Sequence, residues 1–268
     1  MQNKIGLIAG NGKFPILFAQ AAKKKSVSVT AIGIKGETSE EIEAYVDKIY
    51  WLGPGELNKL FATLSNEKIG SVVMAGQVKH KTIFDRSINI DEKMRRLLDT
   101  VKDKKTDSLI GAVAGMLEKA GIKVLDSTTF LADYLPEKGI LTESSPDKRM
   151  LEDIEFGRGI AKSIAGLDIG QTIVVKDKAV LAIEAIEGTD EAIKRGAEYG
   201  KEGIVVVKVS KPGQDMRFDI PTIGPETIKL LKELKASCIS INAKKTLIID
   251  KEETLKAADK AGIAVIAD

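Results

Sequence analysis

The chain has 268 residues, 43% of them hydrophobic and 30% charged, and its 41 basic and 39 acidic side chains leave a formal net charge of +2. The length is sufficient for two domains or one large one, and the near balance of charge argues against a nucleic-acid partner. The single cysteine, Cys238, and the single histidine, His80, exclude an internal disulfide, a cysteine-rich zinc site and a site built from several histidines. Any metal must therefore be held by carboxylates, which favours magnesium or manganese over zinc.

Strands and helices alternate over the first half of the chain. Short apolar runs predict strands at 4–9, 26–34, 48–53, 71–76 and 123–127, and the stretches between them predict helices at 14–25, 56–68, 91–102 and 107–121. Short apolar strands separated by helices are typical of a parallel sheet that is covered on both faces. We therefore expect an N-terminal Rossmann-like domain over residues 1–130.

The pattern changes between residues 129 and 148, where prolines, a glycine and a pair of serines predict a linker, which we place at 131–149. The remaining residues, 150–268, predict a C-terminal α/β domain with a mixed sheet. Its expected elements are a helix at 150–166, a hairpin at 172–186 around the polar KDK, a helix at 189–200, a strand at 203–210, a helix at 225–237 and strand-like residues at 238–250, followed by a last helix and strand. The predicted fold class is α/β with two domains.

The first turn of the chain, IAGNGKFP, contains Gly10, Asn11 and Gly12 between a strand and a helix. These residues supply the first two glycines of a dinucleotide fingerprint, but Pro15 stands where the third glycine belongs. Residues 34–36, at the end of the second strand, include no acid to bind a ribose. A nicotinamide site is therefore not predicted. The turn is either a plain tight connection or a place where the helix N-terminus meets a ligand phosphate.

Two further segments have both a functional and a plain interpretation. In MAGQVK, Gln77 and Lys79 follow a predicted strand at its carboxyl end, where open α/β sheets bind ligands, although a solvated loop also accounts for them. We interpret the adjacent His80 as a surface residue. In KKTDSL, Thr106 or Asp107 is predicted to cap the following helix, and ligand binding by Asp107 is the alternative.

The strongest signal lies in KPGQDMRFDIPTIGPET, residues 211–227, where Asp215, Arg217 and Asp219 alternate. If this stretch is extended, all three side chains point to one side, because alternate residues of a strand share a face. Two carboxylates can hold a divalent ion, and a guanidinium can pair with phosphate oxygens. The alternative is a surface salt bridge on a strand.

A second carboxylate group lies upstream. Glu184 ends the apolar run AVLAIEAI, where a lone carboxylate needs a partner. It would converge with Asp215 if their strands are neighbours. The following Gly188, Thr189 and Asp190 predict a helix start.

Taken together, these motifs resemble one family over nearly the whole chain, the LpxI-type UDP-2,3-diacylglucosamine pyrophosphatases. The segments that carry the resemblance, in chain order, are IAGNGKFP, MAGQVK, TDSLIGAVA, EAIEGTDEAIKR, KPGQDMRFDIPTIGPET and TLIIDKEETLKAADKAGIAVI. EGTDEAIKR and QDMRFDIPTIGPET are the most specific of them. The resemblance implies metal-dependent cleavage of the pyrophosphate of UDP-2,3-diacylglucosamine to UMP and 2,3-diacylglucosamine 1-phosphate in lipid A biosynthesis. It also implies a ligand cleft between two α/β domains.

The resemblance implies a catalytic aspartate in QDMRFD, with Asp215 the first choice and Asp219 the second. Both would hold Mg²⁺ or Mn²⁺, Arg217 and Lys211 would take developing negative charge, and Glu184 or Glu187 would orient water. The residues expected to bind substrate are Gly10, Asn11, Gly12, Gln77, Lys79, Asp107, Glu187, Gly188, Thr189, Asp190, Lys211 and Gln214.

Other functions remain open at this point. The same two-domain fold would also serve a hydrolase or a non-catalytic binder of another nucleotide-linked sugar or lipid. The sequence has no basic leader with a long apolar core and no run of about 18 apolar residues, so we expect a cytoplasmic protein. Peripheral contact with the inner membrane and a homodimer are left open, and no nucleic-acid partner is expected.

Overall fold

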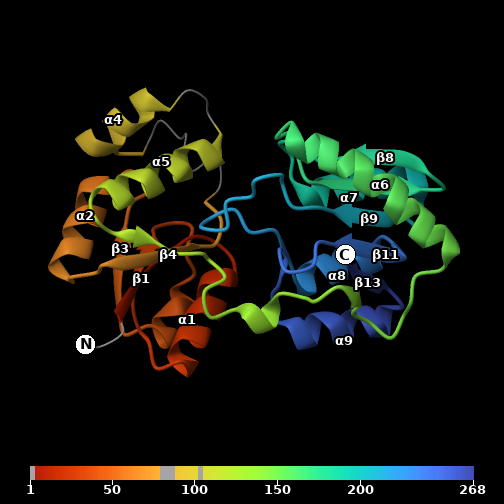
Figure 1. Cartoon of the computed structure of the whole chain (residues 1–268), viewed down its shortest axis with the longest axis horizontal. Coiled ribbons are helices and arrows are strands. Elements are labelled where there is room, and N and C mark those ends of the chain that lie inside the picture. The colour runs from red at the N-terminus through yellow and green to blue at the C-terminus, as the bar shows by residue number, and fades with distance from the viewer. Residues whose placement is uncertain (1–3, 79–87, 102–104) are drawn as a thin grey trace. The chain divides into compact units, whose positions relative to one another are not determined.

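The computed structural model describes residues 4–78, 88–101 and 105–268 (Figure 1). Lys79 and His80 therefore lie outside the described residues. The chain forms two compact units: unit 1 comprises Met1–Ala132 and Asp215–Asp219, and unit 2 comprises Asp133–Gln214 and Ile220–Asp268. In the ranges that the structure describes, no helix is both long enough and apolar enough to cross a membrane.

Unit 1 is built on a parallel sheet with the strand order β3-β2-β1-β4-β5. The strands are β1 (Lys4–Ala9), β2 (Ser28–Ile34), β3 (Lys48–Leu52), β4 (Ser71–Ala75) and β5 (Lys123–Val124). Every neighbouring pair runs parallel, from Lys4 opposite Ser28 to Val72 opposite Val124. The strands are parallel because a helical connection returns the chain to the same end of the sheet. The predicted parallel sheet is confirmed.

Helices cover both faces of this sheet (Figure 1). Helix α1 (Phe14–Lys24) lies on one face, and α2 (Leu57–Asn66), α4 (Glu92–Thr100) and α5 (Thr106–Lys119) lie on the other. Leu64 of α2 and Leu117 of α5 are fully buried in one cluster with Val72 of β4. The short helix η1 (Glu40–Tyr45) follows β2 and contacts α1.

Unit 2 is built on a mixed sheet, as the sequence predicts, with the strand order β6-β13-β11-β9-β7-β8. Strands β9 (Val205–Lys208), β11 (Cys238–Ile241) and β13 (Ala264–Ala267) are parallel to one another. The hairpin β7 (Thr172–Lys176) and β8 (Ala179–Ile183) runs antiparallel to β9 at one side, and β6 (Gly139–Ile140) runs antiparallel to β13 at the other. A separate parallel pair joins β10 (Thr222–Ile223) to β12 (Leu247–Ile248).

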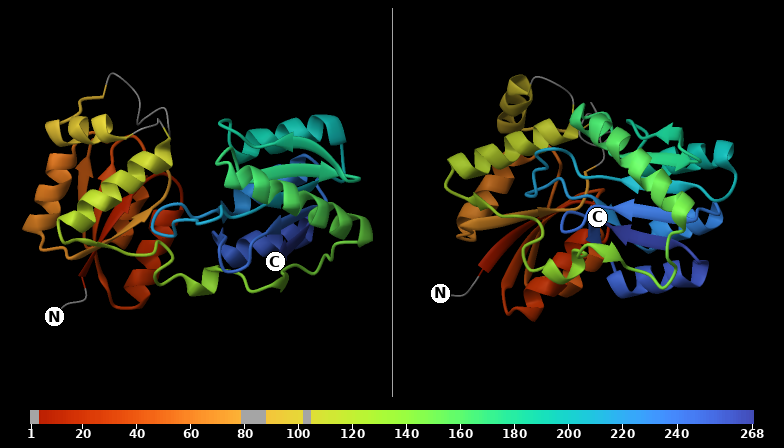
Figure 2. Two further views of the ribbon diagram at one scale, coloured as in Figure 1. Left: turned by 45° about the horizontal axis from the view of Figure 1, so that its top comes forward. Right: turned by 45° about the vertical axis from the view of Figure 1, so that its right-hand side comes forward.

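The helices of unit 2 pack on the two faces of its sheet. Helix α6 (Lys148–Gly166), green in Figure 2, packs Ile154 and Ile164 against a cluster that contains the buried Cys238. On the other face, α7 (Thr189–Gly200), α8 (Pro225–Glu233) and α9 (Lys251–Ala261) bury apolar side chains against Val174 and Ile239. Strand side chains point alternately to the two faces, so one sheet supplies both cores.

The unit boundaries differ in two ways from the predicted domains. Of the expected linker, 131–149, all but the first two residues belong to unit 2; η2 (Ala132–Tyr134) spans the boundary, and β6 pairs with β13. More important for function, Asp215–Asp219 were expected in the C-terminal domain but belong to unit 1. The chain leaves unit 2 at Gln214, adds these residues to unit 1 and returns at Ile220, because the loop packs against the α5 side of the first sheet.

Candidate functional site

The two glycine-containing loops at the carboxyl ends of β1 and β4 lie together. The amide of Gly10 donates to the carbonyl of Ala75 over 2.8 Å, and Asn11 and Gln77 exchange backbone hydrogen bonds of 2.6 and 3.2 Å. A Cβ on Gly10 would lie 2.6 Å from the Gln77 carbonyl oxygen, and a Cβ on Gly76, whose φ is +87°, would lie 2.6 Å from the Asn11 oxygen. Both glycines are therefore required by this close approach of two backbones.

An acidic residue that the sequence analysis missed also reaches this sheet edge. Glu37 is only 6% exposed, and its Oε2 accepts a hydrogen bond of 3.3 Å from the side-chain amide of Asn11. An acid that binds a ribose would be expected directly at the end of the second strand. A turn instead brings Glu37 back: its amide donates to the Ile34 carbonyl, and Gly36 takes a φ of +81°. The glycine before the acid was the available signal.

The segment that carries Asp215, Arg217 and Asp219 is a tight turn, so the extended conformation considered for it is not adopted. The amides of Phe218 and Asp219 both donate to the carbonyl of Asp215, over 3.2 and 2.9 Å. The Asp215 carboxylate accepts the amide of Arg217 at 3.0 Å, which is the local side-chain bond that competes with extended backbone. The three side chains therefore do not line one face of a strand.

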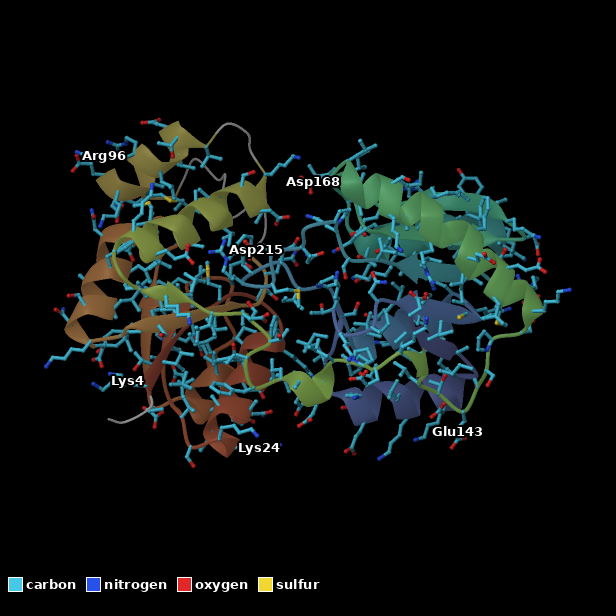
Figure 3. The ribbon with its side chains drawn as sticks, in the orientation of Figure 1. Lys4, Lys24, Arg96, Glu143, Asp168 and Asp215 are labelled. Carbon is cyan, nitrogen blue, oxygen red and sulfur yellow. The ribbon has the colours of Figure 1, made fainter. Side chains whose placement is uncertain are left out.

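Arg217 is held between two carboxylates. Its Nε lies 2.9 Å from Asp215 Oδ1, its Nη2 lies 2.7 Å from Asp215 Oδ2, and its Nη1 lies 2.7 Å from Glu118 Oε1 at the end of α5 (Asp215 is labelled in Figure 3). The hydrogen bonds from Arg217 lower the pKa of Asp215, and those to Asp215 and Glu118 raise the pKa of Arg217. Asp215 is therefore an ionised, oriented carboxylate at neutral pH. Glu118 was not among the site residues predicted from the sequence.

Ser127 fixes this loop to the sheet of unit 1. The side chain of Ser127 is fully buried, and its Oγ lies 2.5 Å from the Met74 carbonyl oxygen and 2.6 Å from the Arg217 carbonyl oxygen. Its amide donates to the Met216 carbonyl over 2.8 Å, and Phe218 packs against the core of unit 1. The loop and the two glycine-containing loops thus share the carboxyl end of β4. In α/β sheets this edge is where ligands bind.

Glu184, in unit 2, has its partners close by. The side chain is 8% exposed; Oε1 accepts the hydroxyl of Thr189 at 2.9 Å, and Oε2 accepts the amide of Gln171 at 3.2 Å. The expected need for a partner is met by these groups. Glu184 and Asp215 belong to different units, so their convergence stays a prediction.

The predicted helix start at Gly188 is confirmed. Gly188, with a φ of +87°, is the N-cap of α7, and Asp190 lies in the first turn, where a negative charge is favourable. Glu187 precedes the cap and accepts hydrogen bonds from the amide of Ala185 and from Arg195. The pKa of Glu187 is lowered, chiefly by a hydrogen bond from its own backbone amide and also by hydrogen bonds from Arg195 and from the amide of Ala185.

Three more predicted ligand residues have defined surroundings. In unit 2, Lys211 forms an ion pair of 3.0 Å with Asp168, and its amide donates to the side-chain oxygen of Gln214 over 2.6 Å. Asp107, in unit 1, is the second residue of α5.

The carboxylates of the loop are chemically suited to a hard divalent ion. Among the residues that the structure describes, no three histidine, cysteine, aspartate or glutamate side chains gather as a metal site. Magnesium usually takes only one or two protein carboxylates and completes its shell with water and substrate phosphates. Asp215 and Asp219 supply two carboxylates of that type.

Each half of the chain matches a known protein-domain family. The LpxI N-terminal domain matches residues 4–134, and the LpxI C-terminal domain matches residues 137–266. A protein of Caulobacter vibrioides named UDP-2,3-diacylglucosamine pyrophosphatase LpxI is 30% identical over 275 residues, covering 98% of this chain and 96% of that protein.

Solved structures show only weak likeness. A UDP-glucose-4-epimerase from Stenotrophomonas maltophila, with bound NAD and a formylated UDP-arabinopyranose, gives a TM-score of 0.31 and 11% identity over 44% of this chain and 34% of that one. An ADP complex of N5-carboxyaminoimidazole ribonucleotide synthetase gives a TM-score of 0.30 and 15% identity, and the match covers 72% of this chain and 35% of that one. This chain matches about a third of each, and such scores carry no argument about function.

Proposed function

The chain belongs to the LpxI family, and from this premise we propose that it is a UDP-2,3-diacylglucosamine pyrophosphatase. The proposed reaction adds water across the bridging P–O–P bond and gives UMP and 2,3-diacylglucosamine 1-phosphate, an intermediate of lipid A biosynthesis. Attack of water at either phosphorus breaks the bond between that phosphorus and the bridging oxygen, so both routes yield the same two phosphate monoesters. The observation that carries the proposal is similarity to a relative of that name along nearly the entire length of both chains.

The Asp215–Asp219 loop supports a reaction at phosphorus. Its five residues carry the two aspartates and Arg217 to the carboxyl end of β4, beside the loops of Gly10 and Gln77. Because the pKa of Asp215 is lowered, its carboxylate is a weak base at neutral pH. We therefore assign Asp215 the role of a fixed charge that orients ligands, and Arg217 the role of holding that carboxylate in place.

Metal dependence is part of the proposal. Arg217 pairs with the carboxylates of both Asp215 and Glu118, so its positive charge is already compensated and does not by itself attract a pyrophosphate. Asp215 and Asp219 would hold Mg²⁺ or Mn²⁺. When bound, such an ion neutralises charge on the phosphate oxygens. Glu184 or Glu187 would orient the attacking water, and Lys211 would contact the substrate anion.

The test is UMP release from UDP-2,3-diacylglucosamine in the presence of Mg²⁺. We expect Asp215→Asn to lower kcat on the order of 100-fold, the scale seen when an oriented charged group is lost from an active site. Asp219→Asn tests the second candidate. Asp99→Asn, the same change on an exposed part of α4, is the matched control and should leave kcat unaltered. Chelation should abolish turnover, and added Mg²⁺ should restore it.

The alternatives predict different results in the same assay. A wild-type protein that binds the UDP-lipid tightly without releasing UMP would contradict the hydrolase and favour a non-catalytic binder. Release of UMP from a non-acylated UDP-sugar, but not from the diacylated one, would favour a hydrolase of another nucleotide-linked substrate.

The proposed substrate also implies where the protein works. Two acyl chains anchor a lipid stably in a bilayer. We therefore propose that the protein works in peripheral contact with a membrane, which, given the expected cytoplasmic location, would be the inner membrane. Co-sedimentation with vesicles that contain the substrate, compared with vesicles that lack it, tests this location, and sedimentation velocity tests for a homodimer.

A further inference from the structure

Lys208 is a buried lysine that the chemistry proposed above does not use. It is the last residue of β9, and only 8% of it is exposed. An ammonium group is costly to bury unless hydrogen bonds and opposite charge compensate it. The partners of Lys208 therefore indicate what the residue does.

The Lys208 ammonium starts a short polar chain inside unit 2. Its Nζ donates to the hydroxyl of Thr189 over 3.3 Å, and that hydroxyl donates to Glu184 Oε1 over 2.9 Å. The hydroxyl of Thr172 lies 3.4 Å from that of Thr189, and Thr172 is fully buried. A cation, a hydroxyl and a carboxylate are thus linked in an order that satisfies donors and acceptors. Thr189 and Glu184 are both candidate site residues.

The same ammonium also joins the two stems of the loop that carries the aspartates. Lys208 ends β9, and Nζ donates over 3.1 Å to the carbonyl of Thr222, the first residue of β10. Between these residues lie Lys211, Gln214 and the five residues of unit 1. The bond therefore fixes, relative to each other, the points where the chain leaves unit 2 and returns to it.

We infer that Lys208 is a positioning residue that holds Thr189 at the start of α7 and both stems of the 209–221 loop in one arrangement. The inference rests on the proposed function, because the groups it positions are the candidate groups of that reaction. Misplacement of reacting groups by about 1 Å can cost on the order of 100-fold in rate. Loss of the ammonium is therefore expected to lower kcat.

The kinetic test compares Lys208→Met with Lys208→Arg and with a matched control. The control is Lys176→Met, because the Lys176 ammonium also donates to two carbonyls in unit 2, Gly200 at 2.9 Å and Glu202 at 2.8 Å, at the far end of α7. We expect Lys208→Met to lower kcat about 10- to 100-fold, Lys208→Arg to recover part of it, and Lys176→Met to stay within about twofold. A folded Lys208→Met protein whose kcat is within twofold of wild type would overturn the inference.

Two further measurements keep the inference testable. If Lys208→Met does not fold because the buried Glu184 loses the cation linked to it through Thr189, the double variant with Glu184→Gln removes both charges. That double variant is compared with Glu184→Gln alone. Amide hydrogen exchange over 188–190 and 209–221 should be faster in the Lys208 variant than in wild type, and not in the Lys176 variant. If wild type releases no UMP, the proposed function fails, and exchange alone decides: unchanged exchange refutes the positioning role.

Discussion

Replacing Ser127 by alanine should have a larger effect on the docking of the aspartate loop, Asp215–Asp219, to the sheet of unit 1 than on the overall stability of the fold. Ser127 Oγ lies within 2.6 Å of the carbonyl oxygens of both Met74 and Arg217. A hydroxyl has one hydrogen, so it donates to one carbonyl at a time. Its removal leaves a buried carbonyl without a donor, at a cost of about 1–3 kcal/mol. That cost shifts the ratio of docked to undocked loop about 5- to 150-fold.

The assay pairs kcat for UMP release with the thermal midpoint of unfolding. Thr254→Val is the matched control, because the fully buried Thr254 hydroxyl also donates to one carbonyl, that of Ile249, over 2.6 Å at the start of α9. We expect both variants to lower the midpoint and only Ser127→Ala to lower kcat. Equal loss of midpoint in the two variants, with kcat unaltered in both, would refute the view that Ser127 holds a functional loop in place.

Three further outcomes follow from the structure. Gly10→Ala should separate the two glycine-containing loops and lower kcat, since its Cβ would lie 2.6 Å from the Gln77 carbonyl oxygen. Gly70→Ala is the control and should leave kcat unaltered, because a Cβ at Gly70 would meet no atom within 4 Å. The pKa of Glu67 is lowered from 4.5 to about 2 by hydrogen bonds from Lys4, Tyr50 and Lys48. The contribution of Glu67 to stability is therefore complete above about pH 4.5 and is lost as the pH falls toward 2. Acid unfolding of the Glu67→Gln variant should lack this component. Burial raises the pKa of the Cys238 thiol to about 12, so a thiol reagent should label it only after unfolding, and rapid labelling of native protein would contradict its burial.

Some features of the proposed site can be predicted from the sequence, and others cannot. Asp215, Arg217 and Asp219 stand out because charged residues lie among prolines and glycines in an otherwise apolar pattern. Their conformation does not follow from that pattern. An extended backbone would give the three side chains one shared face, but the Asp215 side chain accepts a hydrogen bond from the amide two residues on and closes a turn. A short-range side-chain bond outweighed a weak strand preference.

The parallel and mixed sheets, the hairpin of unit 2 and the start of α7 could be predicted from the amino-acid sequence alone, because each depends on apolar periodicity or on local turn and capping signals within a few residues. Which groups meet around the candidate site depends on the tertiary structure. Glu37 meets Asn11 across 26 residues, Ser127 meets Arg217 across 90, and Glu118 meets Arg217 across 99. Contacts between residues so far apart depend on how the strands are ordered in a sheet, and no local pattern encodes that order.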